Sequence, residues 1–177
     1  LDSVASRVKA SYPKAKGPMM VHRLDRETSG LMVVARTLEA YLDFQNQFLN
    51  KTIKKEYIAI LSGIPKYSTP MIKLPLRPDY FQRPRQMVCY SYGKLAETHW
   101  SILEIKEAKA RVLFKPTTGR THQLRVHSAH HDGLNMPIEG DELYGLKSDR
   151  LKLHATALTF QDPANGKLMQ FNLDPDF

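Results

Sequence analysis

Short runs in which apolar and polar residues alternate, each stopped by glycine, proline or a charged stretch, most constrain the fold of this chain. The clearest run covers residues 55–61, which include Tyr57, and it ends before Gly63 and Pro65. Similar strand-like runs occupy residues 87–92, 98–105, 111–115, 153–161 and 168–173. The last two runs flank the sequence DPANG, which is a strong hairpin signal. Period-two patterns joined by short turns predict antiparallel strands, so we expect a fold built around a sheet.

Three segments have the spacing of helices. After Thr37, a residue typical of a helix N-cap, apolar side chains recur at helical spacing through residues 38–49. Near the start of the chain, Val4 and Val8 lie on one side of a predicted amphipathic helix. A third helix is expected to begin near Thr121 and to end at Gly133, because glycine commonly terminates helices.

The other segments are expected to be strands or loops of a single domain. The apolar pieces at residues 19–21 and 31–35 predict two short buried strands. Residues 65–84 contain several prolines and predict loops and edge pieces, because interior strands rarely accept proline. A chain of 177 residues with 42% hydrophobic content suits one domain, which we place at residues 1–177.

Cysteine content and hydropathy limit the cellular setting that we expect. The only cysteine is Cys89, so an internal disulfide is impossible and nothing indicates an oxidising compartment. No apolar run approaches the ~20 residues needed to span a bilayer, and the first residues lack a signal-peptide pattern. We therefore expect a soluble, cytoplasmic and monomeric protein that does not associate with membranes.

The chain is strongly basic, with a formal net charge of +8. Basic residues recur along the whole chain, as at Lys51, Lys54, Lys55, Arg77, Arg83 and Arg85. This distribution favours a folded cationic face that binds nucleic acid. A cationic surface that serves only solubility is the alternative.

The stretch HRLDRETSG, residues 22–30, gathers polar side chains around one carboxylate. Asp25 is surrounded by His22, Arg23, Arg26, Thr28 and Ser29. Gly30 then lets the chain turn back toward an apolar segment. An isolated aspartate in a loop is usually a cap or a turn former. This density of polar neighbours favours a functional site instead.

A second polar cluster, GRTHQLRVH, covers residues 119–127. Its polar side chains are Arg120, His122, Gln123, Arg125 and His127. They crowd a predicted loop-to-helix junction, where free backbone donors suit phosphate, although an ordinary cationic helix start would look the same. His122 and Arg125 are three residues apart and would share a helix face. If both faced Asp25, they would form a charged pocket with it.

Five segments together resemble one enzyme family. HRLDRETSG, KKEYIAILSG, TTGRTHQLRVH, PIEGDELYG and LHATALTF occur in the order found in RluA-type pseudouridine synthases. The resemblance implies an α+β fold with a central, mixed, mostly antiparallel sheet flanked by helices and loops. It implies an enzyme that detaches uracil from ribose, turns the base and reattaches it through carbon, without a cofactor or metal. The expected substrate is a flipped-out uridine of ribosomal or transfer RNA.

The resemblance also implies roles for individual residues. Asp25 is the catalytic aspartate, which attacks the sugar or the uracil ring or promotes an elimination at the sugar. Arg125 pairs with it, which suits the need of a buried carboxylate for a cationic partner. Tyr57 lies against the uracil, where its hydroxyl could help to remove the ring proton. The expected RNA-binding residues are His22, Arg23, Arg26, Thr28, Lys55, Arg120, His122 and Gln123.

Several alternatives remain beside this interpretation. One is an RNA-binding module without modifying activity, and another is a metal-free ribonuclease that uses His22 and His127. A phosphoryl-transfer enzyme lacks a second carboxylate near Asp25 for magnesium. A zinc site at His127, His130 and His131 lacks a nearby cysteine or paired acid. The family pattern further implies a strand and an RNA-binding module ahead of residue 1, so we expect that the natural N-terminus is missing.

Overall fold

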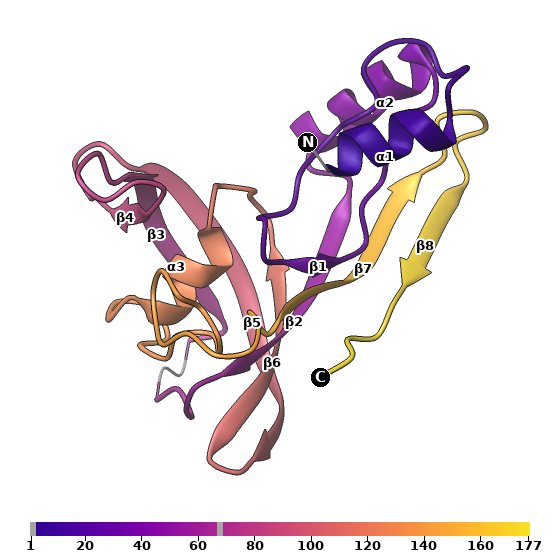
Figure 1. The fold of residues 1–177 in the computed structure, drawn as a ribbon. Helices are drawn as coiled ribbons and strands as arrows, with labels where there is room; N and C mark the ends of the chain where they lie inside the picture. Colours follow the sequence, from indigo (N-terminus) through magenta and orange to yellow (C-terminus); the bar gives the residue numbers. More distant parts are fainter. Residues whose placement is uncertain (1–2, 67–68) are drawn as a thin grey trace.

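One sheet runs through the molecule in the computed structural model, which describes residues 3–66 and 69–177 (Figure 1). The elements in chain order are α1 (Val4–Ser11), β1 (Ser29–Gly30), α2 (Leu38–Leu49), β2 (Lys54–Leu61), β3 (Met71–Pro78), β4 (Gln86–Val88), β5 (Lys94–Lys106), β6 (Lys109–Pro116), α3 (Gln123–Ala129), β7 (Leu153–Gln161) and β8 (Leu168–Asn172). Within these residues the sheet has eight strands in the order β1-β7-β2-β6-β5-β3-β4, and β8 also pairs with β7.

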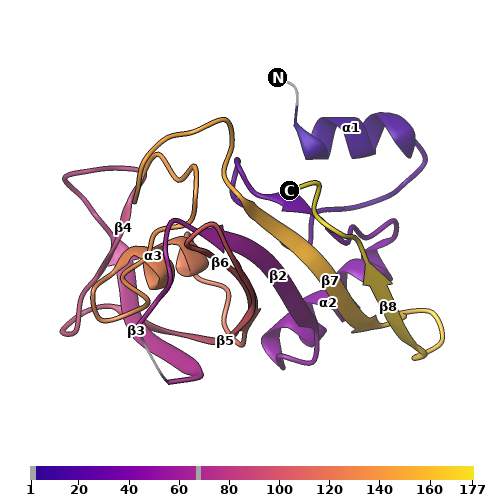
Figure 2. The same ribbon diagram turned by 90° about the horizontal axis from the view of Figure 1, so that it is seen from below.

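The sheet is mixed but almost wholly antiparallel. Only β1 runs parallel to its neighbour, β7, and all other described pairs are antiparallel. The helix α3 contacts β3, β4 and β5, whereas α2 lies at the other end of the sheet, near β7 (Figures 1 and 2). The predicted α+β class with a central, mostly antiparallel sheet is therefore confirmed.

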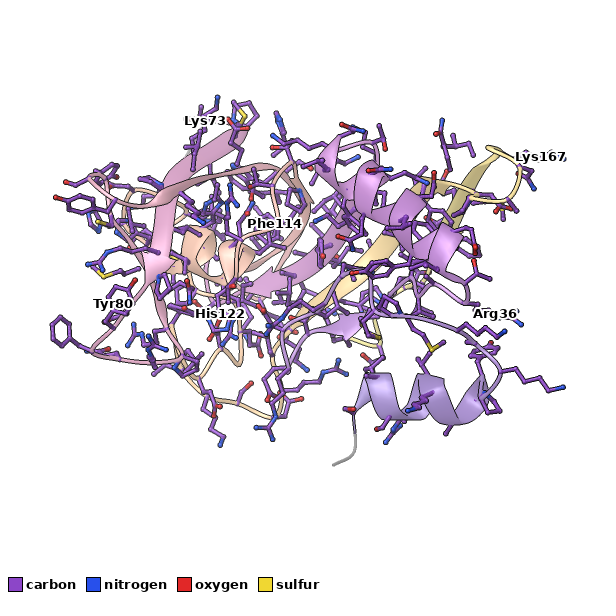
Figure 3. All side chains as sticks on the ribbon, turned by 90° about the horizontal axis from the view of Figure 1, so that it is seen from above. Arg36, Lys73, Tyr80, Phe114, His122 and Lys167 are labelled. Carbon is purple, nitrogen blue, oxygen red and sulfur yellow. The ribbon has the colours of Figure 1, made fainter. Side chains whose placement is uncertain are left out.

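Two apolar clusters stabilise the two halves of the sheet. The larger cluster joins β2, β3, β5 and β6 to α3 and includes Phe114, whose side chain lies in the interior (Figure 3). The smaller cluster packs Phe44 of α2 against Leu158 of β7. It also buries Val21 and Ala35, which lie on either side of the motif segment. Both ends of the HRLDRETSG segment are consequently fixed by burial of apolar surface.

The helix predicted after Thr37 is confirmed. The Thr37 hydroxyl accepts a hydrogen bond from the backbone N–H of Ala40 at 3.2 Å, as an N-cap should. Phe44 and Gln47 are buried, whereas Leu42 is 53% exposed. Gln47 bonds the backbone of Gln161 through its side-chain amide in both directions, at 2.7 and 3.0 Å. A polar anchor thus helps to set the face that α2 presents to the sheet.

Three segments depart from the prediction, two beside the motif and one before β4. Residues 19–21 and 31–35 are not strands, because a single antiparallel bridge between Met20 and Val34 joins them. In contrast, the proline-rich segment contains the eight-residue strand β3, with Pro75 inside it. Its partner β4 pairs only from Leu76 onward, so much of β3 is an edge strand and tolerates proline.

The strand predicted at residues 87–92 and the helix predicted at 121–133 are both shorter than expected. The strand is the three-residue β4. The helix α3 begins only after His122, which has a left-handed backbone with φ of 52°, and it ends before His130, which is extended. Arg125 consequently lies on its first turn. The other predicted strands, including the hairpin of β7 and β8, are confirmed.

No helix in the described part of the chain is long and apolar enough to cross a membrane.

Protonation of the core residue His127 should destabilise the protein below neutral pH. His127 is fully buried, its Nδ1 lies 3.0 Å from Thr98 Oγ1, and burial is the main reason that its pKa is lowered to about 4. In the unfolded chain this histidine takes up a proton near pH 6.5. The contribution of neutral His127 to the free energy of unfolding is therefore lost as pH falls from about 6.5 to about 4. We expect the free energy of unfolding to decrease by up to ~3 kcal/mol from this residue.

Urea unfolding at a series of pH values measures this effect, with His127→Asn as the matched variant. The variant lacks the ionisable group, so its stability should depend less on pH in that window. Equal pH dependence of the two proteins would contradict the assignment.

Candidate active site

A cleft of about 1050 Å³ opens between the motif loop, β2 and the segment that leads into α3. Predicted site residues that line it are His22, Arg23, Asp25, Thr28, Lys55, Tyr57, Arg120 and Gln123. Its cationic lining residues are Arg23, Lys51, Lys54, Lys55, Lys115 and Arg120. The structure therefore brings together side chains from distant parts of the sequence around Asp25.

The loop that carries Asp25 is held against the sheet by its backbone. The N–H of Thr28 donates to the carbonyl of Asp25 at 3.0 Å and closes a turn. The following residues form β1, in which Gly30 pairs with Ala155 of β7. Gly30 has φ of +110°, and a Cβ there would lie 2.3 Å from the Ala155 carbonyl oxygen. Glycine is therefore required for the loop to approach the sheet this closely.

Tyr57 lies on β2, which places its ring in the same cleft. It pairs with Phe114 on one side, and a β-bulge between Glu56 and Tyr57 shifts its register against β7. Burial, followed by the negative charge of Asp25, raises the pKa of Tyr57 to about 12. The phenol is therefore neutral at pH 7, and Asp25 lies close enough to influence it.

The Asp25 carboxylate is half-buried, and no described residue engages its oxygens in a hydrogen bond or ion pair. Its negative charge nevertheless acts on three neighbours. After burial, it is the second cause of the raised pKa of Tyr57, and it partly opposes the lowering of the His122 pKa by burial. The pKa of Arg125 is lowered by burial and raised by Asp141, and the charge of Asp25 adds to the raising. Asp25 thus lies among these side chains with its oxygens available to a reactant.

Arg125 does not pair directly with Asp25 as predicted. Its Nε and Nη2 donate to the two carboxylate oxygens of Asp141 at 2.7 and 2.6 Å, in a fork-like geometry. Both side chains are buried, with exposed fractions of 4% and 0%. Arg125 pairs with Asp141 instead of Asp25 because the Asp141 carboxylate is fully buried beside the guanidinium, and two-point pairing satisfies both buried charges. Arg125 acts on Asp25 only through its electric field.

The segment PIEGDELYG supplies two residues whose roles the sequence prediction missed. Asp141 also accepts from the backbone N–H of Tyr144 at 3.1 Å. The Tyr144 hydroxyl accepts from the backbone N–H of Gln86 at 2.6 Å and lies 2.8 Å from His122 Nδ1. The guanidinium of Arg125 lies over the Tyr144 ring. The sequence contained a signal for these roles. Asp141 and Tyr144 lie in a segment that resembles the family, so both were candidates for contact with Arg125.

Two predicted RNA-binding residues are engaged by the protein itself. His22 Nε2 accepts the backbone N–H of Val33 at 3.0 Å, and burial is the main reason that its pKa is lowered to about 4. Gln123 donates to Glu97 and Thr98, and its carbonyl accepts from Thr118 and the backbone of Arg120. Both side chains therefore form part of the cleft wall. The atoms that make these bonds are already paired within the protein.

The remaining predicted contacts differ in exposure. Arg26 is outside the cleft lining, with a side chain that is 96% exposed and 3.5 Å from Glu27. Burial lowers the pKa of Lys55. The Thr28 hydroxyl is buried and has no partner among the described residues. His122 is also outside the lining, and burial is the main cause of its lowered pKa.

The histidines do not form the arrangements considered from sequence. His127 is fully buried against Thr98 and cannot join His22 as the second catalytic group of a ribonuclease. It is also absent from the one group of possible metal donors in the described residues, which is His130, His131 and Asp132. None of these three lines the cleft.

Comparisons with known proteins agree with the geometry. A sequence model described as RNA pseudouridylate synthase matches residues 1–130. The dual-specificity RNA pseudouridine synthase RluA of Salmonella typhi is 42% identical over 182 residues, covering 99% of this chain and 80% of that protein. The corresponding protein of Haemophilus ducreyi is 43% identical over 185 residues, covering 99% and 81%.

A solved structure supports the same likeness. Human RNA Pseudouridylate Synthase Domain Containing 1 superposes with a TM-score of 0.80 at 26% identity, covering 99% of this chain and 75% of that one. The likeness therefore extends over the sheet and over the loops that form the cleft.

Proposed function

This chain belongs to the RNA pseudouridylate synthase family, and from that premise we propose that it isomerises flipped-out uridines of ribosomal or transfer RNA with Asp25 as the catalytic carboxylate. The observation that carries the proposal is the cleft itself, which both Asp25 and Tyr57 line. Its exposed cationic lining residues, called the cationic rim below, are Arg23, Lys51, Lys54, Lys115 and Arg120. Because the walls of this cleft come from residues 22–153, we assign the activity to residues 1–177 as one catalytic domain.

The reaction exchanges one bond to the ribose for another. The bond from ribose C1′ to uracil N1 breaks, the base turns, and C1′ bonds to C5, which loses its proton while N1 gains one. Asp25 attacks C1′ or the ring, or it removes a sugar proton in an elimination. Each route requires an ionised carboxylate with a free oxygen, and the Asp25 oxygens have no hydrogen-bond or ion-pair partner among the described residues.

We assign Tyr57 to stacking on the uracil and to hydrogen-bond donation. Its aromatic face can hold the base beside Asp25, as aromatic side chains commonly do with unstacked bases. Because its pKa is raised to about 12, the phenol rarely ionises at pH 7 and is a weak base. Help from its hydroxyl in removing the ring proton stays a prediction.

Base flipping and phosphate binding account for the rest of the cleft. Extracting a base from its stack costs a few kcal/mol, and less in a loop or bulge. The rim cations Arg23 and Arg120 are exposed and can contact the backbone of the extruded nucleotide. We propose a monomeric enzyme that meets this RNA in the cytoplasm.

The direct test is incubation of the protein with cellular RNA that lacks pseudouridine, followed by mapping of converted uridines. We expect conversion at a small number of sites, and none with an Asp25→Asn variant. RNA binding without any conversion would favour the alternative of a non-modifying RNA-binding module and would overturn the proposed activity.

The salt dependence of RNA binding tests the cationic rim. Replacing Lys51 and Lys54 together by glutamine should flatten the dependence of log affinity on log salt by about 1.4 to 1.8, because each lost phosphate contact contributes ~0.7 to 0.9. Filter binding at several salt concentrations gives the slope. The control removes two exposed charges outside the cleft lining, at Lys147 and Lys167. Equal slopes for both double variants would contradict the assignment of the rim.

A further inference from the structure

A chain of polar contacts links the C-terminal residues to the motif loop. Arg150 Nη1 donates to both carboxylate oxygens of Asp176 at 2.7 and 2.8 Å. Its Nη2 donates to the Ser29 hydroxyl at 2.9 Å. The Ser29 hydroxyl in turn lies 2.8 Å from His154 Nδ1. Ser29 accepts from the guanidinium, which is always a donor, and the tautomer of His154 sets the direction of the bond between Ser29 and His154.

The Phe177 ring lies against Arg150 and His154 of this chain of contacts. The guanidinium of Arg150 lies 5.5 Å from the centre of the Phe177 ring, and the Lys152 ammonium lies 5.7 Å from it. The His154 ring contacts the same phenylalanine edge-on, with centroids 6.4 Å apart. Cation–π contacts of this kind hold a guanidinium in one orientation.

Ser29 is the point at which these contacts bear on the active site. It lies four residues after Asp25 and forms β1 with Gly30, which is only two residues long. Such a short strand has few backbone hydrogen bonds to hold it, and Leu31 supplies one through its N–H to the Ala155 carbonyl at 3.0 Å. The position of the Asp25 turn therefore depends on side-chain contacts at Ser29 in addition to the backbone.

We propose that Arg150 is a positioning residue for the reaction, which holds the Asp25 loop in place through Ser29 while Asp176 and Phe177 orient its guanidinium. The inference rests on the proposed function, because Asp25 is the group whose position matters. Arg150 does not line the cleft and acts only through the loop.

An ordinary surface ion pair would explain only part of this arrangement. Asp176 is 73% exposed and Arg150 is 34% exposed, so their attraction adds little to stability. Arg150 differs from a simple surface partner because its Nη2 also donates to the Ser29 hydroxyl in the loop that carries Asp25. Loss of that contact should therefore change the position of the loop more than the stability of the fold.

Amide hydrogen exchange tests the anchoring without reference to activity. In Arg150→Met we expect the amides of Thr28 and Leu31 to exchange about tenfold faster, while amides of β2 keep their wild-type rates, because only the loop gains freedom. Unchanged exchange at both loop amides would overturn the proposal. Equal acceleration in β2 would also overturn it, since the effect would then be loss of global stability.

Kinetics on RNA test the consequence for catalysis. We expect kcat of Arg150→Met to fall roughly 10- to 100-fold with KM for RNA nearly unchanged, because a misplacement of about 1 Å carries such a cost. Arg150→Lys should recover part of the loss, and added guanidinium should partly restore Arg150→Met. Lys147→Met removes a charge from the same connecting segment outside the cleft lining and should behave like the wild type.

A double variant tests whether the effects of Arg150 and Ser29 on kcat are coupled. If Arg150 acts through Ser29, the double variant Arg150→Met/Ser29→Ala should lose no more kcat than the more impaired single variant. Multiplicative losses would overturn the proposal. Absence of conversion by the wild type would refute the proposed function, and amide exchange would still decide whether Arg150 anchors the loop.

Discussion

Replacing Asp25 by asparagine is expected to reduce pseudouridine formation by at least about 10⁴-fold, because loss of an essential reacting group has effects of this size. Asparagine has nearly the same shape but cannot act as a nucleophile or base. The Asp25 carboxylate has no hydrogen bond or ion pair to any residue in the described ranges, so the fold should lose little. Affinity for RNA should also change little, since the cationic rim is untouched.

The measurement is single-turnover conversion of uridine in a defined RNA, together with thermal unfolding of both proteins. Glu27→Gln is the matched control, because it removes an exposed carboxylate from the same turn. It should retain activity within about a factor of two of the wild type. An Asp25→Asn protein that keeps more than about 1% of wild-type activity would contradict the catalytic assignment.

The same variant should change the titration of Tyr57. Burial and the charge of Asp25 together raise the pKa of this phenol to about 12. With a neutral asparagine in place of Asp25, only burial remains, so the pKa should fall part of the way toward its ordinary value. Ultraviolet titration of Asp25→Asn against the wild type checks this, with Tyr57→Phe identifying the signal. An unchanged pKa would show that the two side chains do not interact.

Elements determined by local sequence could be predicted, as α2, β2 and the final hairpin demonstrate. Thr37 forms the expected cap, and residues 54–61 alternate as a strand should. The family-like segments also predicted eight of the side chains that line one cleft, although Arg26, His122 and Arg125 lie outside its lining. In each case the information lies within a few neighbouring residues or in a segment long enough to be specific.

Interactions that depend on a choice among distant partners could not be predicted. Arg125 is sixteen residues before Asp141, and nothing in the spacing favours that carboxylate over Asp25. His22 and Gln123 carry polar groups that suit RNA, yet tertiary contacts with Val33 and Thr98 occupy them. Binding capacity therefore depends on which donors and acceptors remain unsatisfied after folding, and that balance is a property of the whole structure.

The buried pair of Arg125 and Asp141 should be the most sensitive point of the fold. We expect Asp141→Asn to reduce the free energy of unfolding by about 3 to 5 kcal/mol, because it leaves a buried guanidinium without its counter-charge. The substitution also weakens acceptance of the backbone N–H groups of Leu143 and Tyr144. Urea unfolding at pH 7 measures the loss. A decrease below about 1 kcal/mol would show that the pair is not isolated from water.

A double variant separates the structural role of Arg125 from its electrostatic role. Arg125→Met with Asp141→Leu removes both buried charges, so stability should recover much of the loss caused by Asp141→Asn. Activity should stay about tenfold or more below the wild type, because the positive charge that interacts with Asp25 is gone. Full recovery of both stability and activity would show that Arg125 serves only the fold. Arg125 donates its hydrogen bonds to Asp141. Its predicted catalytic contribution therefore depends on the electric field of its charge at Asp25.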